Sequence, residues 1–163
     1  MIVWRIAAST PDFTADDISG RGAAMTGGRW NPPGIPALYC ASSISLAYVE
    51  TLAHIDPQGP MPRNRFRVRI DIPDPAWEGR RMASADRETF PLDWNAHPVA
   101  RGSVEYGGKW LRSATEMVLV VPSCVIPQED SIVLNPAHRD FAQVRVLDVG
   151  RIDYDHRLFS GIR

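Results

Sequence analysis

Residues 27–54, GGRWNPPGIPALYCASSISLAYVETLAH, decide the fold of this chain. The stretch begins with two glycines and Arg29, turns through three prolines, and continues into the apolar run ALYCA at 37–41. Closely spaced prolines favour a rigid turn, and a short apolar run bounded by turn residues is typical of a strand. An amphipathic segment carrying Glu50 follows. Arg29, Tyr39 and Glu50 are therefore expected on a loop, a strand and a helix in succession, which indicates a site.

The segment at about 43–55 is predicted to be a helix, capped by Ser42 or Ser43 and ended by Asp56-Pro57. Its expected apolar face consists of Ile44, Tyr48, Val49, Leu52 and Ile55. Glu50 falls at the margin of that face, near Leu46, where a glutamate is most simply a solvated carboxylate.

Working outward, RFRVRIDI at 65–72 is the clearest strand, because apolar residues and arginines alternate along it. Further strands are expected at 3–8, 37–41, 116–123, 131–136 and 143–149. A turn of helix is expected near Ala15–Ile18, and one or two short helices are expected between 98 and 111. Strands outnumber helices, so the prediction is a single compact α+β domain with a mostly antiparallel or mixed sheet and a few short helices.

The composition is that of an ordinary globular protein. The 163 residues are 44% hydrophobic and 23% charged, which predicts one domain with a real core. The net charge of −1 argues against binding nucleic acid by neutralising phosphates. The absence of a signal peptide and of a long apolar span predicts a cytoplasmic protein that does not bind membranes.

Cysteine and histidine usage predicts no metal site. Cys40 and Cys124 are the two cysteines, both expected to be free and buried in a reducing compartment. The four histidines are widely scattered and lack metal-ligand spacing. No phosphate-binding GxxxxGK[ST] occurs, and no GxGxxG follows a predicted strand.

Five separated motifs resemble one family, the RES domain. In chain order they are GGRWNPPG, LYCASS, YVETLAH, VPSCVIP and LNPAHRDF. The resemblance implies one RES domain over residues 1–163, with a fold like that of ADP-ribosyltransferases. It also implies a toxin of a type II toxin–antitoxin pair, partnered by an Xre-like helix-turn-helix antitoxin. A dimer within the toxin–antitoxin complex is compatible with it.

The resemblance also suggests the site residues. The family is named after an arginine, a glutamate and a serine, which correspond here to Arg29, Glu50 and Ser123. Ser113 is a second candidate for the serine, outside the VPS context. Tyr39 matches the pocket tyrosine of the family, and Asn135, in the LNPAH motif, is a further candidate for binding the substrate.

The implied substrate is NAD+, whose nicotinamide–ribose bond breaks through an oxocarbenium-like state, as in glycoside cleavage. Glu50 would stabilise that charge, and Arg29 would clamp the pyrophosphate or an attacking phosphate. Tyr39 would stack on the nicotinamide, and Ser123 would position a ribose or carboxamide group.

Each of these residues also has a purely structural interpretation. Arg29 could pair with a surface carboxylate, Tyr39 could be ordinary core, and Ser123 could bond the backbone where Pro122 ends its strand. The occurrence of all five motifs in the family's order favours a functional site over these structural interpretations.

Three activities follow as hypotheses. The first is consumption of NAD+ as a phosphorylase or glycohydrolase, with inorganic phosphate as the co-substrate of phosphorolysis. The second is a protein ADP-ribosyltransferase that uses the same pocket with a macromolecular acceptor. The third is a partner-binding module without catalysis, which leaves the set of Arg29, Tyr39, Glu50 and Ser123 unexplained.

Overall fold

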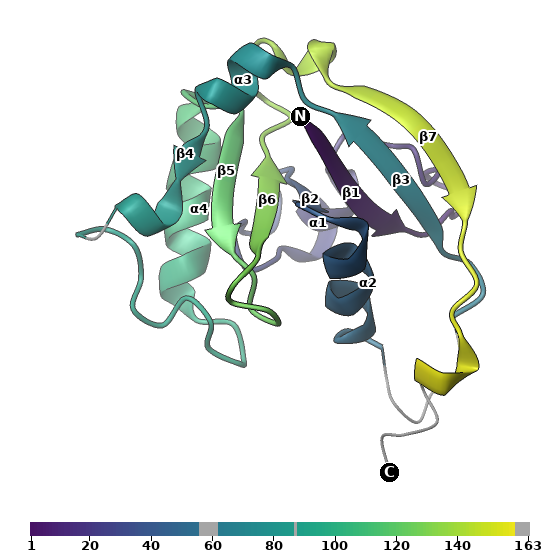
Figure 1. Cartoon of the computed structure of the whole chain (residues 1–163). Coiled ribbons are helices and arrows are strands. Elements are labelled where there is room, and N and C mark those ends of the chain that lie inside the picture. The colour runs from purple at the N-terminus through teal and green to yellow at the C-terminus, as the bar shows by residue number, and fades with distance from the viewer. Residues whose placement is uncertain (56–61, 87, 159–163) are drawn as a thin grey trace.

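A seven-stranded sheet in the order β4-β5-β6-β2-β1-β3-β7 forms the centre of the molecule (Figure 1). The structure is a computed structural model that describes residues 1–55, 62–86 and 88–158. Neighbouring strands in it are antiparallel, apart from the parallel pair β4 and β5. The expected class, a single α+β domain with a mostly antiparallel sheet and few short helices, is confirmed.

The strands are β1 (Ile2–Ala7), β2 (Leu38–Ala41), β3 (Phe66–Asp71), β4 (Arg81–Met82), β5 (Val118–Pro122), β6 (Asp130–Leu134) and β7 (Arg145–Arg151). The α-helices are α1 (Arg21–Thr26), α2 (Ile44–Leu52), α3 (Asp74–Glu78) and α4 (Arg101–Ser113). Short 3-10 helices are η1 (Ala83–Ala85), η2 (Phe141–Gln143) and η3 (His156–Leu158). Each strand expected from the sequence is present, with ends displaced by one or two residues; the two-residue β4 was not expected.

The turn of helix expected near Ala15–Ile18 is wrong. This segment forms a hydrogen-bonded turn, in which the amide of Asp17 donates to the carbonyl of Thr14 at 3.1 Å. The Asp17 carboxylate accepts from the amide of Ser19 at 2.8 Å, a local bond that competes with helix formation. Helix α1 begins only after Gly20, whose φ of 73° lies in the left-handed region.

Helix α4 continues without a break through Gly107 and Gly108. One or two short helices were expected here, and the structure has one. The glycine at 107 permits close packing, since a Cβ there would lie 2.1 Å from the carbonyl oxygen of Trp30. Trp110 and Leu111 of α4 pack with Leu119 and Val121 of β5. The helix is thereby held against the β5–β6 side of the sheet and against the loop that carries Trp30 (Figure 1).

The two faces of the sheet bury different sets of side chains. One face is the larger apolar core, which includes Val3, Leu38, Val68, Ile70, Val118, Val120, Ile132 and Leu134. The side chains that alternate with them point to the opposite face, where α2 and α4 lie. Tyr39 and Ser131 belong to this second face, because they alternate with Leu38 and Ile132. They lie on the part of the sheet between the two helices.

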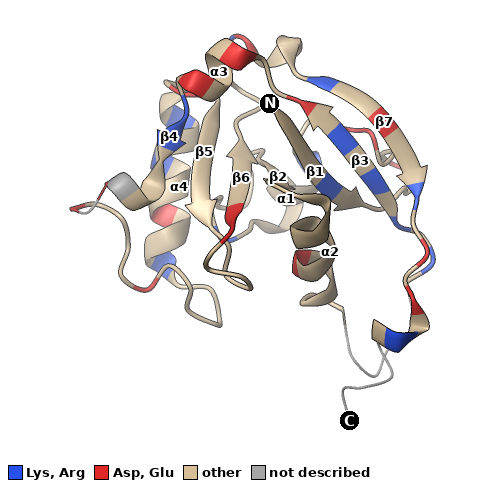
Figure 2. Ribbon diagram, in the orientation of Figure 1, with Lys and Arg blue, Asp and Glu red and all other residues tan. Residues whose placement is uncertain are grey.

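Helix α2 buries a different face from the expected one. Ser43 caps it as predicted, accepting from the amide of Leu46 at 3.1 Å. The fully buried residues are Leu46 and Ala47, which pack on Ala41, whereas the expected face is only partly buried. Glu50 lies one turn after Leu46 and so continues the buried side of the helix. It is the single acidic residue of α2 (Figure 2).

Strands β1 and β2 diverge in the middle of the sheet. Their pairing is registered at Trp4 and Ala41, whereas β1 pairs with β3 along six positions from Ile2 to Ala7. The separation leaves room for a cavity between the two halves of the sheet. In the described part of the chain, no helix is long and apolar enough to cross a membrane.

Candidate active site

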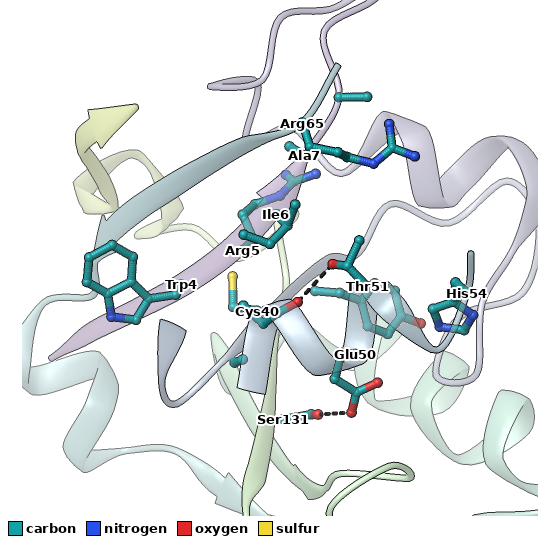
Figure 3. Close-up of a pocket in the computed structure, with 14 residues that line it drawn as sticks. Trp4, Arg5, Ile6, Ala7, Cys40, Glu50, Thr51, His54, Arg65 and Ser131 are labelled. Carbon is teal, nitrogen blue, oxygen red and sulfur yellow. Dashed lines mark hydrogen bonds between the residues drawn. The ribbon is translucent and has the colours of Figure 1, made fainter. Parts of the chain in front are cut away.

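Glu50 is held in place by two serine hydroxyls from neighbouring strands. Ser123, just after β5, donates to Oε1 of Glu50 at 2.6 Å, and Ser131 of β6 donates to the same oxygen at 3.2 Å. Among the described residues, no donor is found for the other oxygen, Oε2. Figure 3 shows this second oxygen turned away from Ser131. The arrangement orients the carboxylate and leaves one of its oxygens free to interact with a ligand.

Ser123 is completely buried, and its hydrogen bonds are directed inward. Its hydroxyl oxygen accepts from the amides of Val125 at 3.1 Å and Ile126 at 2.9 Å. A hydroxyl has two acceptor sites and one proton, so with both amides in place the proton points to Glu50. The structure thus places Ser123 behind the carboxylate, and its expected contact with substrate stays a prediction.

Of the two candidate serines, Ser123 is the one that contacts Glu50. Ser113, at the end of α4, donates to the carbonyl of Trp110 at 2.7 Å. Asn135 is 1% exposed and donates to the carbonyl of Leu111 at 2.8 Å, while accepting from the amide of Ala137 at 3.0 Å. These bonds tie Asn135 to the backbone around it, so its expected contact with substrate stays a prediction without support from its position.

The loop carrying Arg29 is built by a tight turn and a buried asparagine. Gly28 and Asn31 exchange backbone hydrogen bonds of 2.9 and 3.4 Å. The Asn31 side chain, fully buried, donates to the carbonyls of Ala23 at 3.0 Å and Ile35 at 2.9 Å. A Cβ at position 28 would lie 2.7 Å from the Tyr39 hydroxyl, so a glycine is needed for this approach.

Tyr39 presents its ring, and not its hydroxyl, to a cavity. The hydroxyl accepts from the amide of Trp30 at 2.9 Å and donates to Oδ1 of Asn31 at 2.7 Å. Burial raises the pKa of Tyr39 above its ordinary value, so the phenol is neutral. With the polar end satisfied, the aromatic face is what a ligand can contact.

Arg29 contacts the segment that precedes α4. Its Nη1 donates to the backbone carbonyls of Trp94 at 2.7 Å and Ala96 at 2.9 Å. In the described part of the chain no carboxylate forms an ion pair with it. The simple surface ion pair considered from the sequence is therefore not found, and Arg29 lies on the wall of the cavity that Glu50 also lines.

Two cavities meet at Glu50. The first has a volume of about 600 Å³ and is lined by Arg29, Tyr39, Glu50, His54, His97 and Cys124, among others. The second, of about 430 Å³, lies where β1 and β2 diverge and is lined by Arg5, Tyr39, Glu50, His54, Arg65 and Ser131, among others. The residues common to both include Tyr39, Glu50, His54 and Ser131. Together the cavities form an extended site with the carboxylate at its middle.

The second cavity brings two arginines to the site that were not identified from the sequence. In Figure 3 the guanidinium groups of Arg5 and Arg65 lie at the end of this cavity away from Ser131 and the Glu50 carboxylate. Burial lowers the pKa of Arg5, against the opposing effects of Cys40 and Asp17, and an arginine nonetheless stays charged. Its Nη1 donates to the carbonyl of Asp17 at 3.2 Å. The sequence contained one indication that Arg5 is buried. On a strand it points to the same face as Val3 and Ala7, which are both buried.

The two cysteines line different cavities, Cys40 the one between β1 and β2 and Cys124 the larger one. Cys40 is buried as predicted, and burial raises its pKa to about 12. Cys124 is only half-buried, which corrects the expectation that both are buried, and it lines the larger cavity. Its pKa is also raised, chiefly by burial. In the described residues, no group of three or more His, Cys, Asp or Glu is arranged to hold a metal ion.

Known proteins resemble this chain along nearly its whole length. The RES domain family model matches residues 2–155. A Prs ADP-ribosylating toxin of Sphingobium sp. (strain YBL2) is 40% identical over 158 residues, which cover 95% of this chain and 94% of that protein. A Toxin Res of Photorhabdus laumondii subsp. laumondii is 35% identical over 160 residues, covering 97% of each.

A solved structure has the same fold. A chain from the crystal structure of the M. tuberculosis MbcT–MbcA toxin–antitoxin complex superposes with a TM-score of 0.73 at 20% sequence identity. The match covers 99% of this chain and 88% of that one.

Proposed function

Because this chain belongs to the RES domain family, we propose that it is a toxin that cleaves the nicotinamide–ribose bond of NAD+. The observation that carries the proposal is the Glu50 carboxylate, held by two hydroxyls in the middle of an extended site. The similarity to toxins, one of which is called ADP-ribosylating, supports NAD+ as the substrate.

Bond cleavage suits this carboxylate. When the glycosidic bond breaks, its electron pair moves to the pyridinium nitrogen, nicotinamide leaves neutral, and positive charge develops on the ribose carbon. Oε2 of Glu50, which has no donor among the described residues, is free to stabilise that charge or to hold ribose hydroxyls. The hydroxyls on Oε1 keep the carboxylate from rotating, so little reorganisation is required as the charge develops.

The two cavities suit two parts of the dinucleotide, the nicotinamide and the diphosphate. The ring of Tyr39 offers a flat face for the nicotinamide cation. Arg5 and Arg65, in the second cavity, suit the diphosphate because guanidinium groups bind phosphate oxygens in bidentate fashion. We therefore propose these arginines for the pyrophosphate clamp; the Nη1 of Arg29 donates to two carbonyls, whereas the Nη1 of Arg5 donates to one.

The acceptor of the ADP-ribosyl group has three candidates. A phosphate oxygen would give phosphorolysis, and water would give hydrolysis with release of a proton. A nucleophilic side chain of another protein would give ADP-ribosyl transfer. The last is favoured by the name of the relative from Sphingobium sp., which is 40% identical over nearly the whole chain.

The test is incubation of the purified protein with NAD+ in three mixtures: buffer alone, buffer with inorganic phosphate, and buffer with a bacterial protein extract. Nicotinamide release is expected in at least one of them, and mass spectrometry identifies ADP-ribose, its 1-phosphate or a modified protein as the product. Glu50→Gln is the matched control. No nicotinamide release in any mixture would overturn the proposal and would favour a partner-binding module.

A toxin of this kind has to be restrained in the cell that makes it. We accordingly propose an Xre-like helix-turn-helix antitoxin as its partner and the cytoplasm, which holds the NAD+ pool, as its location. Adding the purified antitoxin to the NAD+ assay is expected to suppress nicotinamide release. Full turnover in a stable toxin–antitoxin complex would show that inhibition does not act at the cavity.

A further inference from the structure

Arg29 holds a segment of backbone against the rim of the site. The segment from Phe90 to Val99 has no helix or strand and precedes α4. The Nη1 of Arg29 donates to the carbonyl of Trp94 at 2.7 Å and to the carbonyl of Ala96 at 2.9 Å. One nitrogen thereby joins two carbonyls that lie 65 and 67 residues away in the chain.

The residue after Arg29 holds the same segment by packing. The ring of Trp30 stacks on the ring of Phe90, with the two centroids 5.9 Å apart. The ring centroids of Phe90 and Trp94 are 6.0 Å apart. Tyr106 of α4 meets both Trp30 and Phe90 edge-on. Arg29 and Trp30 therefore anchor the segment by two independent means, a charged donor and an aromatic cluster.

The anchored segment forms part of the cavity wall. Asn95, His97 and Val99 line the larger cavity together with Glu50. The two carbonyl acceptors of Arg29, on Trp94 and Ala96, flank Asn95 directly, and Ala96 precedes His97. Movement of these carbonyls would therefore move the side chains that face the ligand.

We infer that Arg29 is a positioning residue, which acts on substrate through the rim segment 94–97. The expected effect of Arg29 on turnover rests on the proposed NAD+ cleavage. The anchoring of the rim segment by Arg29 does not depend on it. The role needs the length and shape of arginine. A lysine nitrogen ends one bond closer to the backbone than Nη1, so lysine keeps the charge without reaching both carbonyls.

The structural part is tested by hydrogen exchange in the protein without ligand. Within the segment, the amide of Ala96 donates to the backbone carbonyl of Asp93 at 3.0 Å. The amide of Trp94 donates to the backbone carbonyl of Pro91 at 3.3 Å. Arg29→Met is expected to speed exchange in peptides covering 90–99 by roughly tenfold, because hydrogen bonds to a charged donor are lost. Exchange in β3 and β6 should not change. Arg5→Met is the control, and it should leave 90–99 as in the wild type.

The functional part is tested with NAD+ as the probe in a double-mutant cycle. If Arg29 acts through the rim, Arg29→Met and His97→Ala together should lower kcat/KM by much less than the product of their separate effects. Arg29→Lys should behave like Arg29→Met. A charge clamp predicts the reverse, with multiplicative effects and near-wild-type turnover for Arg29→Lys.

The outcomes separate the two claims. Unchanged exchange over 90–99 in Arg29→Met, or full multiplicativity with His97→Ala, would overturn the positioning role. If Arg29→Met does not fold, the exchange pattern and kinetics of Arg29→Lys decide in the same way. Loosened exchange in a protein whose wild type releases no nicotinamide would leave the anchor standing and reject the proposed NAD+ cleavage.

Discussion

The hydroxyl of Ser123 donates to Oε1 of Glu50 at 2.6 Å, although the two residues are 73 positions apart in the chain. Ser131 donates to the same oxygen from the next strand. The carboxylate is therefore oriented by residues of two strands at the place where the two cavities meet. This relationship explains why a glutamate on the buried side of a helix is left with one oxygen available.

Replacing Glu50 should affect turnover more than binding. Glu50→Gln keeps an acceptor oxygen for the two serines but removes the charge that faces the developing oxocarbenium. Loss of one such electrostatic contact costs about 3 kcal/mol, or roughly a hundredfold in rate. We expect kcat to fall by this factor with little change in NAD+ affinity, measured by turnover and by calorimetry. Growth inhibition in a host should disappear. Wild-type turnover by a folded Glu50→Gln protein would remove Glu50 from the mechanism.

The two serines should be distinguishable by stability. Ser123→Ala leaves the amides of Val125 and Ile126, whose bonds are partly buried, without their acceptor, which should cost about 1–3 kcal/mol of unfolding free energy. Among the described residues the Ser131 hydroxyl bonds Glu50 alone, so Ser131→Ala should leave Tm nearly unchanged. Both alanine variants should lower kcat. Ser131→Thr keeps a hydroxyl at position 131 and should have a kcat close to that of the wild type. Thermal melts and NAD+ turnover measured on the three variants provide the comparison. Equal melting temperatures for the two alanine variants would contradict the assigned hydrogen bonds.

Arg5 should contribute to binding of the diphosphate. Arg5→Met keeps a long side chain between the diverging strands but removes the guanidinium. A charge-assisted contact is worth about 1.5–3 kcal/mol, so KM for NAD+ should rise by roughly ten- to a hundredfold while kcat falls less. Arg151→Met, at an exposed arginine of β7, is the matched control and should not change KM. An unchanged KM in Arg5→Met would place the diphosphate elsewhere.

Cys124 provides a pH-dependent report on the cavity. Burial raises its pKa, so at neutral pH it holds less thiolate than an ordinary cysteine and should react slowly with iodoacetamide. The alkylation rate should rise as pH increases, and NAD+ should slow it because Cys124 lines the larger cavity. Cys40, with a pKa raised to about 12, should react more slowly still. Mass spectrometry of the two peptides measures both rates, and no protection by NAD+ would argue against occupancy of this cavity.

Much of this protein is determined locally. Alternation along RFRVRIDI places Val68 and Ile70 in the core, and the Ser43 cap begins α2. The glycines and prolines after residue 26 build a loop whose conformation depends on close backbone approach. The order of the motifs identified the family and predicted a shared site for Arg29, Tyr39 and Glu50, which all line the larger cavity.

The tertiary structure decided what these residues contact. The role of Ser131 depends on the register of β6 against β2, and that of Arg5 on the divergence of β1 from β2. The bonds from Arg29 to the carbonyls of Trp94 and Ala96 also depend on the tertiary structure, and its expected contact with phosphate stays a prediction. Periodicity and turn chemistry extend over a few residues, so they predict elements and the direction of their side chains. Contacts between segments 65 to 81 residues apart arise only when the sheet packs, and no local pattern encodes them.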